Sequence, residues 1–94
     1  MDIILCGGGD IGSAVAEMLT AGGESVTLID PDEKKTRHLN DRLDISTIEG
    51  SASSASILRS AGVAQADAVI ATTDVDEVNL VICDVAASLG AART

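Results

Sequence analysis

The chain has 94 residues, of which 15 are acidic and six are basic, so its formal net charge is −9. This length supports one domain with a modest core, and the charge disfavours binding to nucleic-acid phosphates or anionic lipid. Phe, Tyr and Trp are absent, so the core must be aliphatic, and no apolar run approaches the about 20 residues that a membrane span needs. We therefore expect a single cytoplasmic domain.

Four short apolar runs predict β-strands. They are rich in Ile, Val or Leu and cover residues 2–6, 25–30, 45–49 and 68–72. Continuous apolar runs of this length are typical of strands that are buried on both faces, as in a parallel sheet.

Amphipathic segments after the first two strands predict helices. The first covers residues 10–21, ends before a pair of glycines, and has an inward face formed by Ile11, Val15, Met18 and Leu19. The second follows Pro31, which can occupy a first helical turn. It runs to about Leu43 with Leu39 and Leu43 facing inward.

Two further helices follow the third and fourth strands. The third begins near Ser53 or Ser54, whose hydroxyl groups can cap it, and ends at Gly62. The fourth follows Asp74 and ends at Gly90. Its inward stripe is formed by Val78, Val81, Ile82, Val85 and Leu89.

This alternation of strands and helices predicts a Rossmann-like α/β fold. Right-handed crossovers give a parallel sheet in the order 3-2-1-4, flanked by helices. The pattern would next require a fifth strand, so we expect residues 1–94 to form a domain that is incomplete at its C-terminus. The fourth strand would then be an exposed edge, which predicts self-association.

A glycine-rich motif joins the first strand to the first helix. Residues 7–12 read Gly-Gly-Gly-Asp-Ile-Gly and satisfy the dinucleotide-binding pattern G-x-G-x-x-G. In that pattern Gly7 permits a tight turn, Gly9 lets a pyrophosphate approach the backbone, and Gly12 lets the helix pack closely on the strand. The N–H groups at the start of the helix would face the phosphates.

Asp30 ends the second predicted strand, 18 positions after Gly12. At a spacing near 20, an acidic residue binds the adenosine ribose hydroxyls; capping the helix after Pro31 is an alternative role that can coexist. A 2′-phosphate would meet this carboxylate with like charge, and no arginine immediately follows, so the motif favours NAD or NADH over NADP. Asp10, near the phosphates, should disfavour a triphosphate and ranks NAD(H) above ATP.

The sequence lacks the residues of a self-contained dehydrogenase. Such an enzyme needs a proton donor or acceptor beside the nicotinamide, but tyrosine is absent and the single histidine, His38, falls among surface charges. Both cysteines lie in apolar segments without an adjacent base. The acidic group Asp74, Asp76 and Glu77 is the ordinary complement to a helix amino terminus rather than a cation site.

Four segments of the chain resemble the regulator-of-potassium-conductance N-terminal domain of Trk/Ktr-type potassium uptake proteins. They are D-I-I-L-C-G-G-G-D-I-G, V-T-L-I-D-P-D, I-E-G-S-A-S-S and A-T-T-D-V-D-E-V-N. Many Rossmann proteins share the first segment, whereas the last is much more characteristic of this family. The resemblance extends from Met1 to about Gly90.

This resemblance implies a cytoplasmic gating subunit. Such a subunit binds a nucleotide, forms homo-oligomers and attaches to a membrane potassium channel or transporter at the inner face of the membrane. Ligand binding would favour one arrangement of the assembled domains and so control ion flow.

The resemblance also implies a set of ligand contacts. The residues expected near the phosphates are Gly7, Gly9, Asp10, Ile11 and Gly12. Asp30 would bind the adenosine ribose, and Ser51 and Ala52 would lie near adenine. On the side of the fourth strand, the expected contacts are Thr72, Thr73 and Glu77. Ser51 is shorter than the Asp or Asn that is usual in the family, so we expect altered adenine affinity.

The leading hypothesis is therefore a regulatory NAD(H)-binding domain of a potassium uptake or channel system, without enzymatic activity. One alternative is the cofactor-binding fragment of an NAD-dependent dehydrogenase. Another is an ATP- or ADP-sensing domain of the same fold. The segment from Ala71 to Asn79 and the missing acid-base residues favour regulation.

Overall fold

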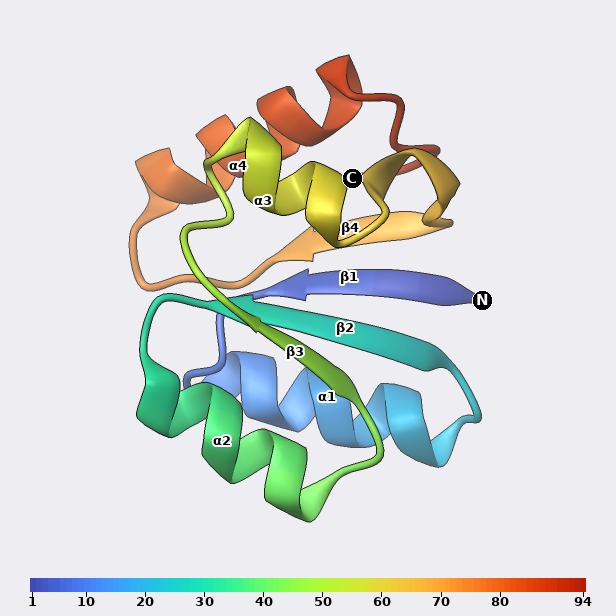
Figure 1. Cartoon of the computed structure of the whole chain (residues 1–94), viewed down its shortest axis with the longest axis vertical. Helices are drawn as coiled ribbons and strands as arrows, with labels where there is room; N and C mark the ends of the chain where they lie inside the picture. Colours follow the sequence, from blue (N-terminus) through green and yellow to red (C-terminus); the bar gives the residue numbers. More distant parts are fainter.

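A computed structural model describes all residues, 1–94, as a parallel sheet with helices on both faces (Figure 1). The elements follow in the order β1 (Asp2–Cys6), α1 (Asp10–Ala21), β2 (Ser25–Asp30), α2 (Glu33–Arg42), β3 (Ser46–Glu49), α3 (Ala55–Ser60), a 3₁₀ turn η1 (Val63–Gln65), β4 (Ala68–Ala71) and α4 (Asp76–Ser88). The predicted strands and helices are all present, although β3 begins one residue later and β4 ends one residue earlier than predicted.

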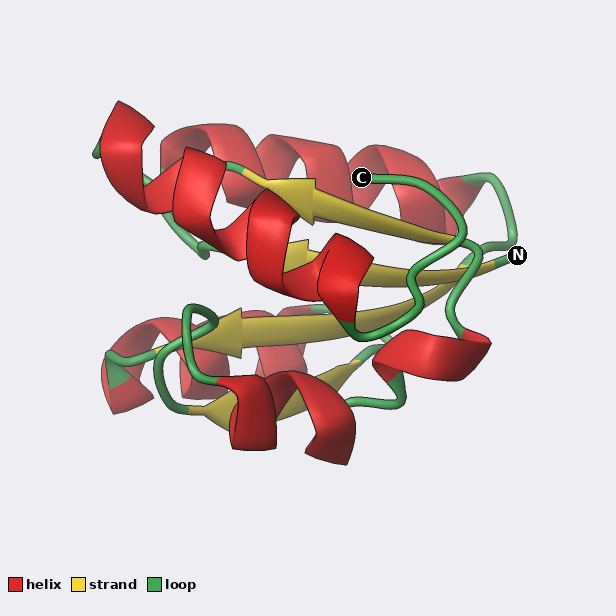
Figure 2. Ribbon diagram, turned by 90° about the horizontal axis from the view of Figure 1, so that it is seen from above, coloured by secondary structure: helices red, strands yellow, loops and turns green.

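The sheet has the strand order β3-β2-β1-β4, and every neighbouring pair is parallel. This confirms the predicted Rossmann-like topology, and in Figure 2 the strand arrows all point to the same side of the molecule. The ladder continues past the strand ends, because Gly7 N–H donates to the Ile29 carbonyl at 2.9 Å and Thr72 N–H donates to the Cys6 carbonyl at 2.8 Å. The connections that leave this carboxyl edge therefore lie side by side, where open α/β sheets bind ligands.

Two aliphatic clusters hold the helices to the sheet, one on each face. The cluster against α3 and α4 includes Ile4, Cys6, Ile29, Leu58, Val69 and Ile82. The cluster against α1 and α2 consists of Leu5, Ala16, Val26, Leu28 and Leu39. Because successive strand residues point to opposite faces, β1 contributes to both clusters and is almost completely buried.

The buried face of α1 differs from the predicted one. Two of the four predicted residues pack against the core, Val15 and Leu19. The other two do not, since Ile11 is 69% exposed and Met18 is 73% exposed. Gly12 and Ala16 take the buried positions instead, because α1 approaches the sheet too closely for larger side chains.

The stripe on α4 is also narrower than predicted. Ile82 is buried, and Val85 and Leu89 pack against the core, but Val78 and Val81 are 37% and 48% exposed. The C-terminal part of the stripe is therefore buried, whereas its first two residues are partly open to solvent.

The start of α2 corrects another prediction. Asp32 is the N-cap residue, and its side chain accepts a hydrogen bond from Lys34 N–H at 2.9 Å. Pro31 therefore precedes the helix instead of occupying its first turn. Ser54 is the N-cap residue of α3, within the predicted pair, but makes no side-chain cap hydrogen bond. No helix combines the length and the apolar character that a membrane span requires.

Candidate functional site

The glycine-rich turn after β1 depends on glycine at its first and last positions. Gly7 has a φ of 113°, and a Cβ there would lie 2.9 Å from the Thr72 carbonyl oxygen. A Cβ on Gly12 would lie 1.8 Å from the Gly7 carbonyl oxygen. These contacts confirm that Gly7 permits the turn and that Gly12 permits close packing of α1.

Gly9 has no comparable structural reason to be glycine. Its φ of −74° is accessible to any residue, and a Cβ there would have no neighbour closer than the Asp74 carboxylate oxygen at 4.0 Å. Gly9 is also the N-cap residue of α1 and makes no side-chain cap bond. The first N–H groups of this helix have no intrahelical acceptor, so the turn presents hydrogen-bond donors beneath open space.

Asp30 ties this turn to the end of β2. Its side chain is buried, with the residue 5% exposed. One carboxylate oxygen accepts a hydrogen bond from Gly8 N–H and the other accepts from Asp32 N–H, both at 2.8 Å. Asp30 is therefore a bridge between the glycine-rich turn and the segment before α2, while Asp32 caps the helix.

The loop after β4 is held by Asn79, a residue in the second turn of α4 that the sequence did not single out. Its side-chain oxygen accepts from Thr73 N–H at 2.9 Å and from the Thr73 hydroxyl at 2.6 Å. Its side-chain nitrogen donates to the Thr73 carbonyl at 3.1 Å. One amide thus fixes both sides of Thr73. Thr72 is anchored separately, since its hydroxyl donates toward the Gly7 carbonyl at 3.3 Å.

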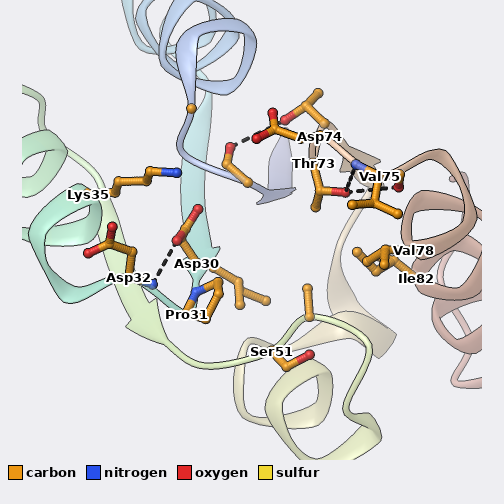
Figure 3. Close-up of a pocket in the computed structure, with 15 residues that line it drawn as sticks. Asp30, Pro31, Asp32, Lys35, Ser51, Thr73, Asp74, Val75, Val78 and Ile82 are labelled. Carbon is orange, nitrogen blue, oxygen red and sulfur yellow. Dashed lines mark hydrogen bonds between the residues drawn. The ribbon is translucent and has the colours of Figure 1, made fainter.

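These segments surround a cavity of about 300 Å³ at the carboxyl edge of the sheet (Figure 3). Its lining comes from the glycine-rich turn, the end of β2 with the start of α2, the loop after β3, and the loop after β4 with α4. The lining residues are Gly7, Gly9, Ile29, Asp30, Pro31, Asp32, Lys35, Ser51, Ala52, Thr72, Thr73, Asp74, Val75, Val78 and Ile82. The cavity has an apolar side near Ile29, Val78 and Ile82 and a polar side near the turn.

The charged lining residues are three carboxylates and one ammonium group. Asp30, Asp32 and Asp74 contribute the negative charges, and Lys35 contributes the positive charge. No group of three His, Cys, Asp or Glu side chains is arranged to hold a metal ion. Burial raises the pKa of the Cys6 thiol to about 12, so this cysteine is protonated in the core beneath the site.

A family model for the TrkA-N domain matches residues 3–94. The chain belongs to the TrkA-N domain family. The "Trk system potassium uptake protein TrkA" of Halomonas elongata is 43% identical over 89 residues, which make up 95% of this chain and 20% of that protein. The chain thus spans about one fifth of this relative's length.

Three solved structures share the fold at 22% sequence identity. The TrkA-N domain of inner membrane protein ybaL from Escherichia coli superposes with a TM-score of 0.87 over 95% of this chain and 65% of that one. The GsuK channel bound to NAD superposes with a TM-score of 0.83 over 95% of this chain and 16% of that one. The AMP-bound form of the Shewanella denitrificans Kef CTD superposes with a TM-score of 0.81 over 94% of this chain and 52% of that one. These likenesses establish the Rossmann-like fold.

The cavity of this TrkA-N domain brings together most of the predicted ligand residues. Those that line it are Gly7, Gly9, Asp30, Ser51, Ala52, Thr72 and Thr73. The predicted residues outside the lining are Asp10, Ile11, Gly12 and Glu77. Asp10, Ile11 and Glu77 are exposed on the first turns of α1 and α4, whereas Gly12 is buried. Ligand contacts by all eleven residues stay predictions.

Sequence reasoning did not assign four polar residues to the site, namely Asp32, Lys35, Asp74 and Asn79. Lys35 lies among the charged residues around His38, which are typical of a solvated helix face, yet it lines the cavity. Asn79 lies near the start of α4, six positions after Thr73, and the asparagine side chain is well suited to bond nearby backbone groups. The available signals were the positions of Lys35 and Asn79 near the starts of helices at the carboxyl edge of the sheet and the place of Asn79 at the end of the characteristic segment 71–79.

Proposed function

We propose that this TrkA-N domain is a regulatory module of a potassium uptake or channel system that binds NAD(H) and does not transform it. The observation that carries the proposal is the open space above Gly9, next to the buried carboxylate of Asp30. This arrangement fits the pyrophosphate and the adenosine ribose of a dinucleotide.

The residues present fit each part of such a ligand. Phosphates would meet the free N–H groups at the start of α1. The ribose hydroxyls would donate to Asp30, whose oxygens retain lone pairs beyond the two hydrogen bonds they already accept. Adenine would lie on the apolar side, near Ala52 and Ile82. The NAD-bound GsuK channel, which has the same fold, supports this choice of ligand.

The absence of local chemistry supports a sensing role. Hydride transfer to or from a carbonyl substrate needs a positioned proton donor or acceptor. The cavity lining contains no His, Cys or Tyr. Of its three carboxylates, Asp30 is held by two backbone N–H groups and Asp32 caps α2. The relatives' name, a potassium uptake protein, supports regulation of ion transport.

Sensing requires that the ligand binds one arrangement of the protein better than another. The cavity is lined by loops from four separate connections, so a bound nucleotide would contact four parts of the chain at once. In the proposed assembly, copies of the chain form a homo-oligomer attached to a membrane potassium transport subunit at its cytoplasmic face. Nucleotide binding would bias the arrangement of the copies and hence ion flow.

Titration with NADH, NAD, ATP and ADP tests this proposal. The chain has no tryptophan, so NADH fluorescence can be followed without interference. We expect saturable NADH binding and no NADH consumption on addition of carbonyl compounds. ATP or ADP binding without NADH binding would instead support an adenylate sensor, and NADH oxidation by a carbonyl compound would support a dehydrogenase fragment.

A further inference from the structure

Lys35 occupies a distinct position among the basic residues of α2. It is the third residue of the helix, and it lines the nucleotide cavity. Lys34 and Arg37, on the same helix, line a different surface hollow together with His38. In Figure 3 the Lys35 side chain extends from α2 toward the strand that ends in Asp30.

The ammonium group of Lys35 has no ion-pair partner in the protein. The side-chain ion pairs of the chain join Arg37 to Glu33 and Arg42 to Glu17. Asp30, although close to the same cavity, directs its two oxygens to backbone N–H groups. Lys35 is therefore a free cation beside a cavity that also holds three carboxylates.

This charge arrangement creates a requirement for any anionic ligand. A nucleotide phosphate that enters the cavity meets the negative field of the lining carboxylates and of a chain with net charge −9. The donors at the start of α1 offset part of this repulsion. Lys35 offers the remaining positive charge at short range, with an ammonium that can donate to a phosphate oxygen.

We propose that Lys35 binds the phosphate attached to C5′ of the adenosine ribose. This inference rests on the proposed function, since it places the ribose at Asp30 and the phosphates at Gly9. The side chain of Lys35 starts on α2, beyond Asp30, and extends back toward β2, so its ammonium faces the point where ribose and phosphate join.

The experiment compares Lys35→Met with Lys34→Met by calorimetry at low ionic strength. Both variants remove one positive charge from neighbouring exposed positions and keep an unbranched apolar side chain, so they alter the overall field alike. The ligands are adenosine, 5′-AMP, 2′-AMP and NADH. We expect K35M to weaken the binding of 5′-AMP and of NADH by about 3- to 10-fold, as for a partly exposed charged contact. Adenosine affinity should be unchanged, and K34M should stay within about 2-fold of wild type.

Three results would overturn the proposal. If K35M weakened adenosine binding as much as 5′-AMP binding, Lys35 would act through packing or stability. Equal weakening of 5′-AMP by K34M would mean that only the general field matters. A loss confined to 2′-AMP would move the contact to the other side of the ribose. If wild-type protein binds 5′-AMP but not NADH, the proposed NAD(H) sensing fails, and the 5′-AMP comparison still decides the role of Lys35.

Discussion

Gly9→Ala separates ligand binding from folding in a way that few substitutions at this site can. The added Cβ has no protein atom closer than 4.0 Å, and the backbone angles suit alanine. Alanine is a poorer N-cap than glycine by about 0.5–1 kcal/mol, but it restricts the unfolded chain and returns about 0.4–1 kcal/mol. The free energy of unfolding should therefore change by less than about 1 kcal/mol.

The same methyl group would occupy the space through which a phosphate reaches the N–H groups of α1. Losing one charge-assisted hydrogen bond costs about 1.5–3 kcal/mol, so NADH affinity should fall by about 10- to 100-fold. Gly12→Ala is the contrasting variant, because its Cβ would lie 1.8 Å from a backbone oxygen. It should cost about 3 kcal/mol or more of stability, which lowers Tm by about 12–24 °C.

Thermal unfolding and NADH fluorescence titration of the two variants measure both effects. The reasoning predicts a stable Gly9→Ala protein that binds NADH weakly and a destabilised Gly12→Ala protein. Unchanged NADH affinity in Gly9→Ala would refute the idea that the ligand approaches this backbone. A large loss of stability in Gly9→Ala would show that the space above it is needed by the fold.

Three further variants or conditions test other parts of the site. Asp30→Ala should lower the free energy of unfolding by about 2–4 kcal/mol, because it leaves the buried Gly8 N–H without an acceptor. Exposed Asp32→Asn keeps a good N-cap, so its free energy of unfolding in urea should lie within about 0.5 kcal/mol of the wild-type value. Asn79→Ala should weaken NADH binding about 3- to 10-fold by releasing the Thr73 loop, and equal binding in a titration would contradict that role. Burial raises the pKa of Cys6 to about 12. The protonated thiol therefore contributes its full stability below the ordinary thiol pKa near 8.5, and this contribution is lost as pH rises toward 12, by up to about 1.4 kcal/mol per pH unit. A free energy of unfolding that stays constant above pH 9 would contradict this.

The sheet and its edge could be predicted from the sequence because the strands are almost entirely apolar. Runs such as Ile3 to Cys6 have no polar face, so only a strand covered on both sides fits them. The strand order then follows from right-handed crossovers. The position of Asp30 at the carboxyl edge follows from the same two arguments, whereas the ribose contact that its spacing from the glycines indicates stays a prediction.

Helix faces were harder to predict because hydrophobicity is a poor guide where elements approach closely. Ile11 and Met18 have the spacing of an inward face, but α1 lies near enough to the sheet that Gly12 and Ala16 are buried in their place. The role of Lys35 depends on the direction of its side chain relative to a cavity formed by four distant loops. That geometry arises only from the tertiary fold.

Backbone amide shifts recorded by NMR during an NADH titration test the central claim most directly. We predict that the largest shift changes occur at residues lining the cavity, namely Gly7, Gly9, Ser51 and Thr73. Residues of the hollow at the other end of the strands, such as Asp2, Ser25 and Gln65, should change little. Shifts concentrated at that second hollow, or no saturable shifts with NADH at all, would contradict NAD(H) binding at the glycine-rich turn.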